Sequence, residues 1–411
     1  MATILGCRWS LRAAACLSIV FVIGGPVRAQ SPTLSITLTG QSMIRSDFRA
    51  HAPTAVATIA PLLKGDVIFT NFEGTIAEKG ESVTEGRGFL APPEALDALQ
   101  ALGFNLVALS DNHSFDLKVT GIQNALREVK SRNLAHAGIG NTLEEAAAPG
   151  YLQTPKGTVA LVSTASGLIA EGGSATPARP GVNELRIEAG GKPNESTNML
   201  PAEPGNEPNL EDKQRILQSI RDAHQHADVV IVYEHNHVFL NRPFIPMFGE
   251  ELPERLAPAD WLKRWTHEEI DAGADIIVMH GAPLLHGVEI YHKRPIFYDL
   301  GNFIFNLSPT ILFLDEPIIW ESVIAHVEFQ NKNLKSITFQ PIVMNKIGQG
   351  QPDNQNPYAN NLFLQTRGLP KLASGEQARY ILERLADFSR AFATKVEVKG
   401  ETAEIELGSG N

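Results

Sequence analysis

Cysteine is almost absent from this chain. The 411 residues contain two cysteines, Cys7 and Cys16, and both lie among the first 29 residues. If that segment is removed, the rest of the chain can form no disulfide, so its stability must come from core packing and from any bound metal. A composition with 43% hydrophobic and 20% charged residues supplies ample core material for a soluble globular protein.

Long apolar runs are also scarce, with one exception at the start. Beyond residue 29, no segment approaches the roughly 20 uninterrupted apolar residues of a membrane-spanning helix. Residues 1–29 begin with the basic Arg8 and Arg12, continue with an apolar stretch at 13–24 and end in the small Ala29. This arrangement is typical of a secretory signal peptide and predicts an exported protein, periplasmic or extracellular. The alternative is an uncleaved N-terminal anchor.

Basic residues are outnumbered by acidic ones. The formal charge is −11, and removal of the three arginines within residues 1–29 would take it near −14. This balance argues against nucleic acid or an anionic membrane as a partner. A negatively charged substrate would need local basic groups or a metal. The phosphate-loop and serine-hydrolase motifs are also absent, which argues against those mechanisms.

Strand-like and helix-like segments alternate from residue 34 onward. The strand-like runs are rich in Val, Ile and Leu, and they lie at 34–40, 66–74, 105–110, 158–164, 227–235, 274–281 and 294–305. Several are nearly continuous in these residues, as in strands covered on both faces. Helical spacing of apolar residues predicts helices at 92–103, 121–133, 210–227 and 257–273. A repeated order of strand and helix predicts an α/β fold with layered sheets and helices.

Two segments depart from this alternation. Residues 171–208 are rich in Gly, Pro, Asn, Ser and Glu, and predict a loop insertion. This insertion is either a disordered surface segment or a lid beside a site. An amphipathic helix is predicted at 375–393, within a C-terminal helical appendage at 346–411 that packs on a main domain at 30–345.

Polar residues follow several of the predicted strands. In an open α/β sheet, ligands bind at the carboxyl ends of the strands, so side chains at these positions are expected to gather. They are Gln41, Asn71, Glu73, Asp111, Asn112, His113, His235, His237 and His280. A single histidine at a strand end is commonly a hydrogen-bonded structural residue, but carboxamides, carboxylates and imidazoles at successive strand ends favour a metal site. Mixed nitrogen and oxygen ligands suit Zn, Mn or Fe.

Further residues near these motifs have candidate supporting roles. Asp116 follows His113 by three residues and is predicted to orient its imidazole, with a helix cap as the alternative. Arg45, Arg87 and Arg179 lie in predicted loops and are candidates for holding a carboxylate or phosphate through their forked guanidinium groups. The alternative for each arginine is a solvated surface position.

Six motifs occur in order along the chain: "DVIFTNFEG", "GFNLVALSDNHSFDLKVTGI", "HAGIGNTLEEAAAP", "RPGVNELR", "VVIVYEH" and "HGAPLLHGVEIYHKRPIFYDLGNFIF". Together they resemble the capsule synthesis protein CapA family, whose members are linked to poly-γ-glutamate. The resemblance covers roughly residues 34–345. It implies a variant of the calcineurin-like metallophosphoesterase fold, a four-layer α/β/β/α sandwich with two metals between its sheets.

The resemblance also implies roles for individual residues. Its Asn-x-Glu-Gly motif falls on Asn71, Glu73 and Gly74, and its Asn-Asn-His motif falls on Asp111, Asn112 and His113. One metal would then be held by Glu73, Asn112, His235 and His280, and His113 would be the acid that meets the leaving group. In the family, the other metal is held largely by an Asp and a His at the positions of Gln41 and Pro283 here. One metal site is therefore expected to be intact and the second weakened or lost, unless His237 or His286 substitutes.

Two functions follow from these expectations. The first is a metal-dependent hydrolase or transferase that acts on poly-γ-glutamate or a related anionic polymer, or on a small envelope substrate. One metal can still activate water or polarise a carbonyl, with His113 moving protons, so amide chemistry is at least as plausible as phosphoester cleavage. The second is a non-catalytic envelope protein that binds polymer or a membrane synthase complex. The altered Gln41 and Pro283 favour the second, and the retained His113 with Asp116 favours the first.

Overall fold

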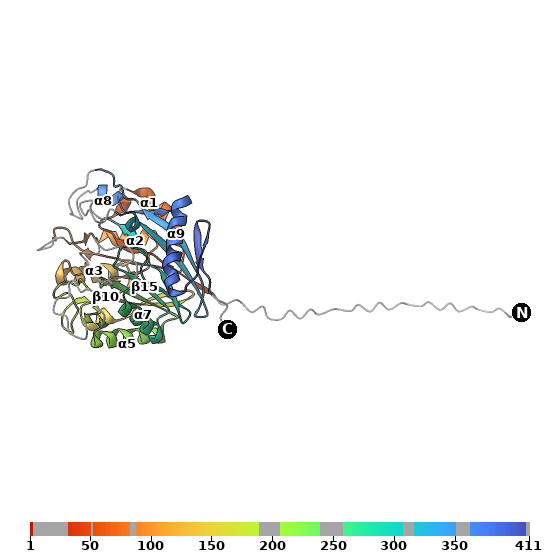
Figure 1. Ribbon diagram of the computed structural model, residues 1–411, viewed down its shortest axis with the longest axis horizontal. Coiled ribbons are helices and arrows are strands. Elements are labelled where there is room, and N and C mark those ends of the chain that lie inside the picture. Colours follow the sequence, from red (N-terminus) through yellow and green to blue (C-terminus); the bar gives the residue numbers. More distant parts are fainter. Residues whose placement is uncertain are drawn as a thin grey trace. The chain divides into compact units, whose positions relative to one another are not determined.

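Two β-sheets pack face to face in the computed structural model, and helices cover their outer surfaces (Figure 1). The structure describes residues 1–2, 32–50, 52–82, 88–188, 206–238, 258–306, 316–350 and 362–407, and all structural statements below concern these residues. Pro32–Asn411 forms one unit. Met1–Ser31 forms a separate unit, of which two residues are described.

The larger sheet has nine strands in the described part of the chain. Their order is β22-β23-β20-β19-β1-β3-β6-β7, and β21 lies beside β20. The parallel strands are β1 (Thr33–Leu38), β3 (Val67–Asn71), β6 (Leu106–Ala108) and β7 (Ala135–Ala137). The antiparallel strands are β19 (Glu321–Gln330), β20 (Asn333–Met344), β21 (Pro370–Leu372), β22 (Val396–Lys399) and β23 (Thr402–Ile405). The carboxyl ends of β1, β3 and β6 therefore meet at one edge.

The smaller sheet has six described strands in the order β16-β17-β15-β14-β10-β9. Its central strands β10, β14, β15 and β17 are parallel, so their carboxyl ends also share an edge. The strands are β9 (Gly150–Thr154), β10 (Gly157–Ser166), β14 (Val229–Asn236), β15 (Ile276–His280), β16 (Val288–Tyr291) and β17 (Arg294–Phe297).

Short strand pairs connect the loops at these edges. They are β2 (Gln41–Met43) with β18 (Asn302–Phe305), β4 (Thr75–Ile76) with β5 (Leu90–Ala91), β8 (Ile139–Gly140) with β11 (Gly181–Val182), and β12 (Ile187–Glu188) with β13 (Glu207–Pro208). The β2–β18 pair joins segments that are distant in sequence and fixes the loop that follows β1, whereas the β4–β5 pair closes a local loop after β3.

Helices form the outer layers. They are α1 (Pro53–Ile59), α2 (Glu94–Leu102), α3 (Lys118–Ser131), α4 (Leu143–Ala147), α5 (Leu210–His226), α7 (Asp260–Ala272), α8 (Leu362–Thr366) and α9 (Gly375–Ser389). Figure 1 shows α1 and α2 at one side of the sheets and α5 at the opposite side. Helix α2 ends where the sequence predicts, because Gly103 takes the left-handed conformation (φ 103°) that favours glycine.

Three hydrophobic clusters define the layers. Phe69 of β3 and Ile231 of β14 belong to one cluster, which fills the space between the two sheets. Ile68 belongs to a second cluster with residues of α2 and α3, and Val232 belongs to a third with residues of α5 and α7. Because successive side chains of a strand point to opposite faces, these memberships give the layer order helix, sheet, sheet, helix. The predicted four-layer α/β/β/α sandwich is confirmed.

The C-terminal segment is partly helical and partly sheet. Helix α9 packs its apolar face, including Ile381 and Leu385, against the inter-sheet cluster. The segment predicted as a helical appendage also supplies β21, β22 and β23 to the larger sheet. Of the predicted loop insertion, residues 189–205 lie outside the described residues.

The predicted strand at 294–305 is wrong as a single element. The structure divides it into β17 and β18, which belong to different sheets. Between them, Gly301 has a positive φ of 72°, and its backbone N–H donates a 2.6 Å hydrogen bond to Asp299 Oδ1. This turn moves the chain from the smaller sheet to the β2–β18 strand pair, and Asp299 lies just after the carboxyl end of β17.

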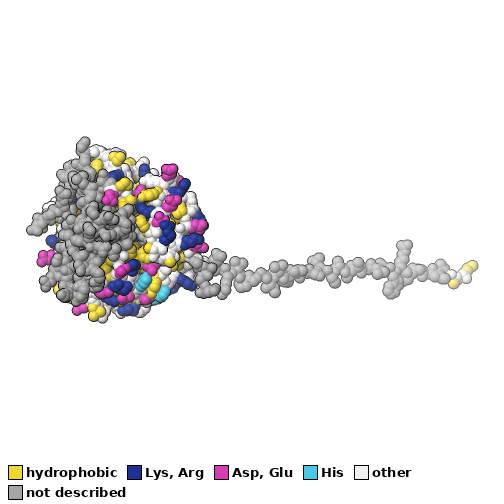
Figure 2. Space-filling model, viewed as in Figure 1, with side chains coloured by type: hydrophobic (Ala, Val, Ile, Leu, Met, Phe, Trp, Pro, Cys, Tyr) yellow, Lys and Arg dark blue, Asp and Glu magenta, His cyan; other side chains and the backbone are white. Residues whose placement is uncertain are grey.

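The charged side chains on the surface and the length of the helices are relevant to possible partners. On the face drawn in Figure 2, the described Lys and Arg side chains lie among Asp and Glu side chains. Among the described helices, none is both long and apolar enough to cross a membrane.

An ion pair between the exposed Arg186 and the buried Asp212 ties the loop before β12 to helix α5, and its loss should be measurable. Arg186 donates Nε and Nη2 hydrogen bonds of 2.7 and 3.0 Å to Asp212, and Arg215 donates one of 2.6 Å. Burial opposes ionisation of Asp212, but the two arginines outweigh it and lower its pKa below 3.8. Asp212→Asn should reduce the free energy of unfolding at pH 7 by about 2–3 kcal/mol, measured by urea denaturation.

The difference in the free energy of unfolding between wild type and Asp212→Asn should depend on pH. Since the folded-state pKa of Asp212 is depressed, its stabilisation is fully present above the ordinary value of 3.8 and is lost as the pH falls through the folded value. The gap between wild type and Asp212→Asn should therefore narrow below about pH 4. Asp222→Asn on the exposed face of α5 is the control. An equal loss in both variants would contradict the prediction.

Candidate metal centre

Strand alternation brings the predicted histidines to one face of the smaller sheet. Tyr233 of β14 lies in the inter-sheet cluster, so His235 and His237, two and four residues later, point to the same side. In the parallel register, His235 of β14 lies opposite His280 of β15. Gly281 permits this approach, because a Cβ there would lie 2.0 Å from the Asn236 carbonyl oxygen. Three imidazoles therefore face the carboxyl edge of the other sheet.

Asn112, His235 and His237 form a close trio across the two sheets. Asn112 Oδ1 lies 2.9 Å from His235 Nε2 and 3.2 Å from His237 Nε2, and the two imidazole nitrogens are 3.1 Å apart. Ligands at 2.0–2.1 Å around a tetrahedral Zn²⁺ lie about 3.3–3.4 Å from one another. The three atoms are thus close to the spacing of three corners of such a site. Tyr233 hydroxyl, 2.9 Å from His235 Nδ1, orients that ring.

Glu73 supplies the nearest carboxylate. Its Oε1 lies 3.9 Å from His235 Nε2 and 4.0 Å from His113 Nε2. Burial raises the pKa of Glu73 to about 7, with the positive charge of His113 opposing the rise and Asp116 adding to it. Among the described residues, no three His, Cys, Asp or Glu side chains complete a metal-ligand set by themselves. The close trio includes an asparagine, and Glu73 must approach by a small side-chain movement to join it.

The turn after β6 is rigidly fixed. The His113 backbone N–H donates to Asp111 Oδ1 at 2.8 Å, the Asp111 backbone N–H donates to Ser114 Oγ at 3.0 Å, and Ser114 Oγ donates to the Leu109 carbonyl at 2.7 Å. These bonds explain the residue types in "SDNHS", because the Asp111 and Ser114 side chains form hydrogen bonds with the backbone of the turn itself. Asn112 at its tip is thereby directed at the histidines.

His113 and Asp116 form a hydrogen-bonded pair at the edge of the trio. His113 Nδ1 lies 2.9 Å from Asp116 Oδ2, so the predicted orienting contact is present in the structure. The same oxygen accepts a 2.7 Å hydrogen bond from the Phe89 backbone N–H, and the Phe89 ring lies 4.0 Å from the imidazole. Gly74 leaves room for this strand, because a Cβ there would lie 3.0 Å from the Phe89 carbonyl oxygen. His113 Nε2 is left to face Glu73 and solvent, with the side chain 18% exposed.

The pKa is shifted downward for His235 and His237 and upward for His113. Burial lowers the pKa of His235 well below its ordinary value and that of His237 to about 3. Both rings are therefore neutral at pH 7, as metal-ligating imidazoles must be. Burial opposes protonation of His113 as well, but Asp116, Glu73 and Asp111 outweigh it and raise its pKa. Two imidazoles suited to coordination thus lie beside one suited to carry a proton.

The other predicted ligand residues, His280, Asn71 and Gln41, have no hydrogen bond to the trio in the described structure. Both ring nitrogens of His280 are buried without a hydrogen bond of ordinary geometry, although the Thr39 backbone lies nearby. Asn71 Nδ2 donates to the Ala108 carbonyl at 3.2 Å, and Gln41 Nε2 donates to Asn302 Oδ1 at 3.0 Å. The structure joins none of these three to the trio by a hydrogen bond within the described residues.

The three predicted arginines have different environments. Arg45 is buried, with its guanidinium 5.3 Å from the centre of the Phe89 ring; burial lowers its pKa to about 10 against the opposing charge of Asp116. Arg179 Nη2 donates to the Ser174 carbonyl at 3.0 Å, in the loop before β11. Arg87 lies outside the described residues. Of the three, Arg45 is thus the one placed next to the His113–Asp116 pair.

Several acceptor atoms at this edge have no donor in the described structure. Gln41 Oε1, Asn71 Oδ1, Glu73 Oε2 and Asp111 Oδ2 are all buried and lack a hydrogen-bond partner. Buried acceptors left without donors are costly, and a cation is the group that satisfies several of them at once. Of these four residues, Glu73 is the one with a distance to the trio, through its other carboxylate oxygen at 3.9 Å from His235 Nε2.

Sequence reasoning missed two residues of this region, Phe89 and Asp299. Phe89 has no signal in the sequence, because its role depends on the pairing of β4 with β5. Asp299 follows β17 and is 2% exposed. Its position at the end of a strand was a signal of the same kind as that of His280.

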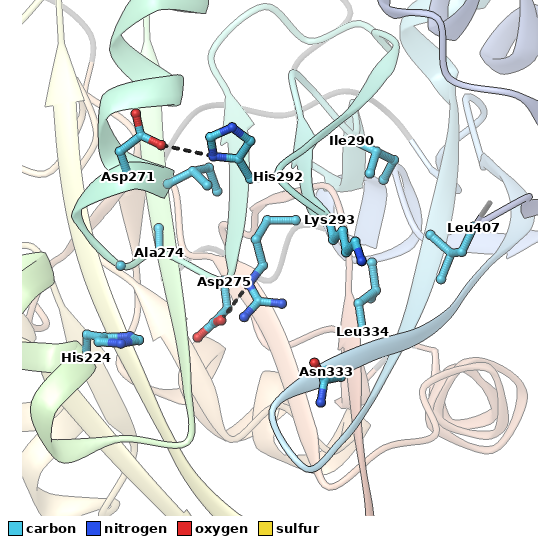
Figure 3. A pocket seen from close by; sticks show the side chains of 13 residues that line it. His224, Asp271, Ala274, Asp275, Ile290, His292, Lys293, Asn333, Leu334 and Leu407 are labelled. Carbon is cyan, nitrogen blue, oxygen red and sulfur yellow. Dashed lines mark ion pairs between the residues drawn. The ribbon is translucent and has the colours of Figure 1, made fainter. Parts of the chain in front are cut away.

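A separate cavity lies at the other end of β15 (Figure 3). It has a volume of about 690 Å³, and its wall includes Asp271, Asp275, His292, Lys293 and Arg294. His292 pairs with Asp271 at 3.2 Å, and Arg294 pairs with Asp275 at 2.8 Å. Since Asp275 precedes β15 and His280 ends it, about 16 Å of strand separates the cavity from the histidines. Its charged groups largely neutralise one another, and we assign it no ligand.

The layer order is helix, sheet, sheet, helix, and Asn, His and Glu side chains lie at the facing strand ends. A family model described as "Bacterial capsule synthesis protein PGA_cap" matches residues 35–307. This match covers more than half of the chain, and the chain belongs to that family.

Curated relatives include two uncharacterized proteins and two CapA proteins. Two proteins of Sinorhizobium fredii, y4sH and y4uA, are each 28% identical over 437 residues, covering 87% of this chain and 89% of theirs. The PGA biosynthesis protein CapA of Bacillus subtilis is 28% identical over 213 residues, covering 52% of this chain and 46% of its own. The capsule biosynthesis protein CapA of Bacillus anthracis is 25% identical over 257 residues, covering 60% and 53%. The matched region thus spans about half the length of each CapA protein.

Solved structures give only distant similarity. A hypothetical protein from Thermus thermophilus has a TM-score of 0.41 at 12% identity, covering 75% of this chain and 98% of its own. The NAD nucleotidase of Haemophilus influenzae has a TM-score of 0.37 at 12% identity, covering 77% and 51%.

Proposed function

We propose that this chain is an exported metal-dependent hydrolase or transferase that acts on an amide or phosphoester bond of an anionic envelope polymer. The observation that supports it best is the convergence of Asn112 Oδ1, His235 Nε2 and His237 Nε2 within 2.9–3.2 Å, beside a hydrogen-bonded His113–Asp116 pair. A ligand group next to a positioned proton donor is the arrangement that hydrolysis requires.

The residues would divide the work as follows. Asn112, His235, His237 and Glu73 would hold a transition metal such as Zn, Mn or Fe. When bound, the metal would supply Lewis acidity toward a substrate oxygen or a water molecule. His113 Nε2 faces the open side of the site and would give a proton to the leaving group, while Asp116 on Nδ1 fixes the tautomer and the ring orientation.

The substrate class rests on charge and on the relatives. The chain is acidic overall, so an anionic polymer would need the metal and a nearby cation such as Arg45. Poly-γ-glutamate is the polymer that the CapA resemblance suggests, and an envelope setting agrees with the predicted signal peptide. A membrane synthase complex is a candidate partner, and nucleic acid is not.

A second candidate is a non-catalytic protein that binds polymer or a synthase. Its support is the amide pair between Gln41 and Asn302, with a 3.0 Å hydrogen bond where the family has an Asp ligand, together with Pro283 in place of a His. A protein that lost turnover would tolerate such replacements. It would have no need of the His113–Asp116 pair.

A combined measurement of metal and turnover tests the proposal. Purified protein should contain at least one tightly held transition metal per chain by elemental analysis. It should also release product from γ-glutamyl amides or p-nitrophenyl phosphates, and Glu73→Ala should lower both metal content and rate. Protein that holds metal but turns over neither substrate class, and that binds γ-glutamyl oligomers, would favour the second candidate. Protein that binds no transition metal would contradict the proposal.

A further inference from the structure

A single strand pair carries two residues that contact His113. Strand β4 begins two residues after Glu73, and its partner β5 begins one residue after Phe89. The two strands are parallel, with Thr75 opposite Leu90, and the Thr75 backbone N–H donates a 3.0 Å hydrogen bond to the Phe89 carbonyl. The segment that enters β5 therefore lies directly beside the segment that follows Glu73.

His113 contacts both Glu73 and Phe89. Its Nε2 lies 4.0 Å from Glu73 Oε1, and its ring centre lies 4.0 Å from the Phe89 ring centre, with the two planes inclined by 58°. Gly74 has a φ of 147°, and a Cβ there would lie 3.0 Å from the Phe89 carbonyl oxygen, so the two strands approach closely. The pairing of β4 with β5 thus fixes how far Phe89 lies from the imidazole.

The Phe89 backbone holds the other partner of His113. Its N–H donates a 2.7 Å hydrogen bond to Asp116 Oδ2, and this same oxygen lies 2.9 Å from His113 Nδ1. Phe89 therefore acts at two points, because its N–H holds the carboxylate that orients the imidazole and its ring packs against the imidazole itself. Both contacts leave His113 Nε2 directed toward Glu73 and the open side of the site.

Arg45 supports the Phe89 ring. Its guanidinium carbon lies 5.3 Å from the ring centre, and its Nε lies 3.5 Å from the Leu90 carbonyl oxygen. Arg45 is 3% exposed, whereas Phe89 is partly exposed and packs at the margin of the core cluster that includes Phe115. A planar cation against an aromatic ring is a favourable contact that a leucine side chain would not provide. The ring is therefore held by a specific contact as well as by packing.

We propose that Phe89 is a positioning residue for His113, the proposed proton donor: its ring restricts rotation of the imidazole, while its backbone N–H fixes Asp116. Reacting groups are held in place by neighbours whose own conformations are locked, and Phe89 is locked by Arg45 and by β4. A phenylalanine that only fills space could be replaced by leucine with no change in the imidazole. This inference rests on the proposed function, because it gives His113 the role of proton donor.

Nuclear magnetic resonance of protein with isotope-labelled histidine tests the positioning without any substrate. The His113 ring signals are those that disappear in His113→Gln. In wild type they should be displaced by the ring current of Phe89 and should show cross-peaks to its ring protons. Phe89→Leu should move them to the values of an unstacked imidazole, and Phe89→Tyr should leave them close to wild type. Unchanged His113 signals in Phe89→Leu would overturn the proposal.

A matched control separates this effect from the loss of any partly buried ring. Phe392 is also partly buried, and its ring centre lies 4.8 Å from that of Tyr298. Phe392→Leu should leave the His113 signals unchanged. Movement of these signals in both variants would overturn the proposal, because the effect would then be general. Should Phe89→Leu fail to fold, missing cross-peaks between Phe89 and His113 in wild type would overturn it.

Steady-state kinetics on a responsive substrate completes the test. Phe89→Leu should lower kcat by about 10–100-fold, the cost of a small misplacement of a reacting group, with KM and metal content close to wild type. Phe89→Tyr should restore most of kcat. A higher KM with an unchanged kcat would overturn the proposal, because the ring would then bind substrate instead of positioning His113. If wild type turns over no substrate but its His113 signals depend on Phe89, the proposed function fails and the positioning stands.

Discussion

His235→Ala is expected to lose most of the affinity for a transition metal at the Asn112 position. The His235 side chain is 1% exposed, and its Nε2 lies 3.9 Å from Glu73 Oε1. Removal of one neutral imidazole leaves Asn112, His237 and Glu73, a set with a single nitrogen ligand, and this set should hold a transition metal more weakly. Since changes to residues that merely support ligands cost about 10–100-fold in affinity, removal of a ligand should cost at least about 100-fold. Competition with a chromophoric chelator measures this loss.

A matched histidine provides the control. His326 of β19 is partly buried, and its Nδ1 lies 2.9 Å from the Thr37 hydroxyl, in the antiparallel part of the larger sheet. His326→Ala should lower stability without changing the metal affinity at the trio. Wild-type metal affinity in His235→Ala would show that the trio is a hydrogen-bonded structural cluster, and it would remove the main support for a metal-dependent reaction.

Much of the layered core could be predicted from local sequence. β14 and β15 are short continuous apolar runs, and helices α2 and α7 end at Gly103 and Gly273, which have positive φ. These features depend on nearest neighbours in sequence and on burial of both strand faces, so periodicity alone identifies them. The antiparallel strands were harder to predict from the sequence. β22 and β23 have four residues each, too few to establish a period, and they form only because β20 offers an open edge.

The sequence could predict which residues belong to the candidate site, but not which of them touch. Residues at strand ends could be named from sequence, because parallel strands expose the same edge. Which of them touch depends on register: His237 reaches Asn112 because β14 continues to Asn236, whereas His280 ends its strand without a hydrogen bond. Asp299 was hidden inside an apparent single strand, because the change of sheet at Gly301 cannot be read from the residues on either side.

His113→Gln is expected to lower the rate on a responsive substrate by about 10²–10⁴-fold while leaving the metal bound, since loss of a positioned general acid costs that much. Glutamine keeps a donor at similar reach but cannot release a proton to a leaving group. The metal should remain because His113 Nε2 lies 4.0 Å from Glu73 and no described hydrogen bond joins it to Asn112, His235 or His237. Initial rates and elemental analysis on the same preparation measure the two quantities.

Asp116→Asn separates proton transfer from ring orientation. An amide at this position can still accept hydrogen bonds from His113 Nδ1 and from the Phe89 N–H, so the ring should stay in place and the fold should be kept. It no longer stabilises the imidazolium, so the rate should fall by a smaller factor, about 10–100-fold, as for other groups that support a reacting residue. Equal losses in both variants would make His113 a structural residue. A His113→Gln chain with the wild-type rate would exclude it as the acid and leave the metal ligands as the only chemical groups of the site.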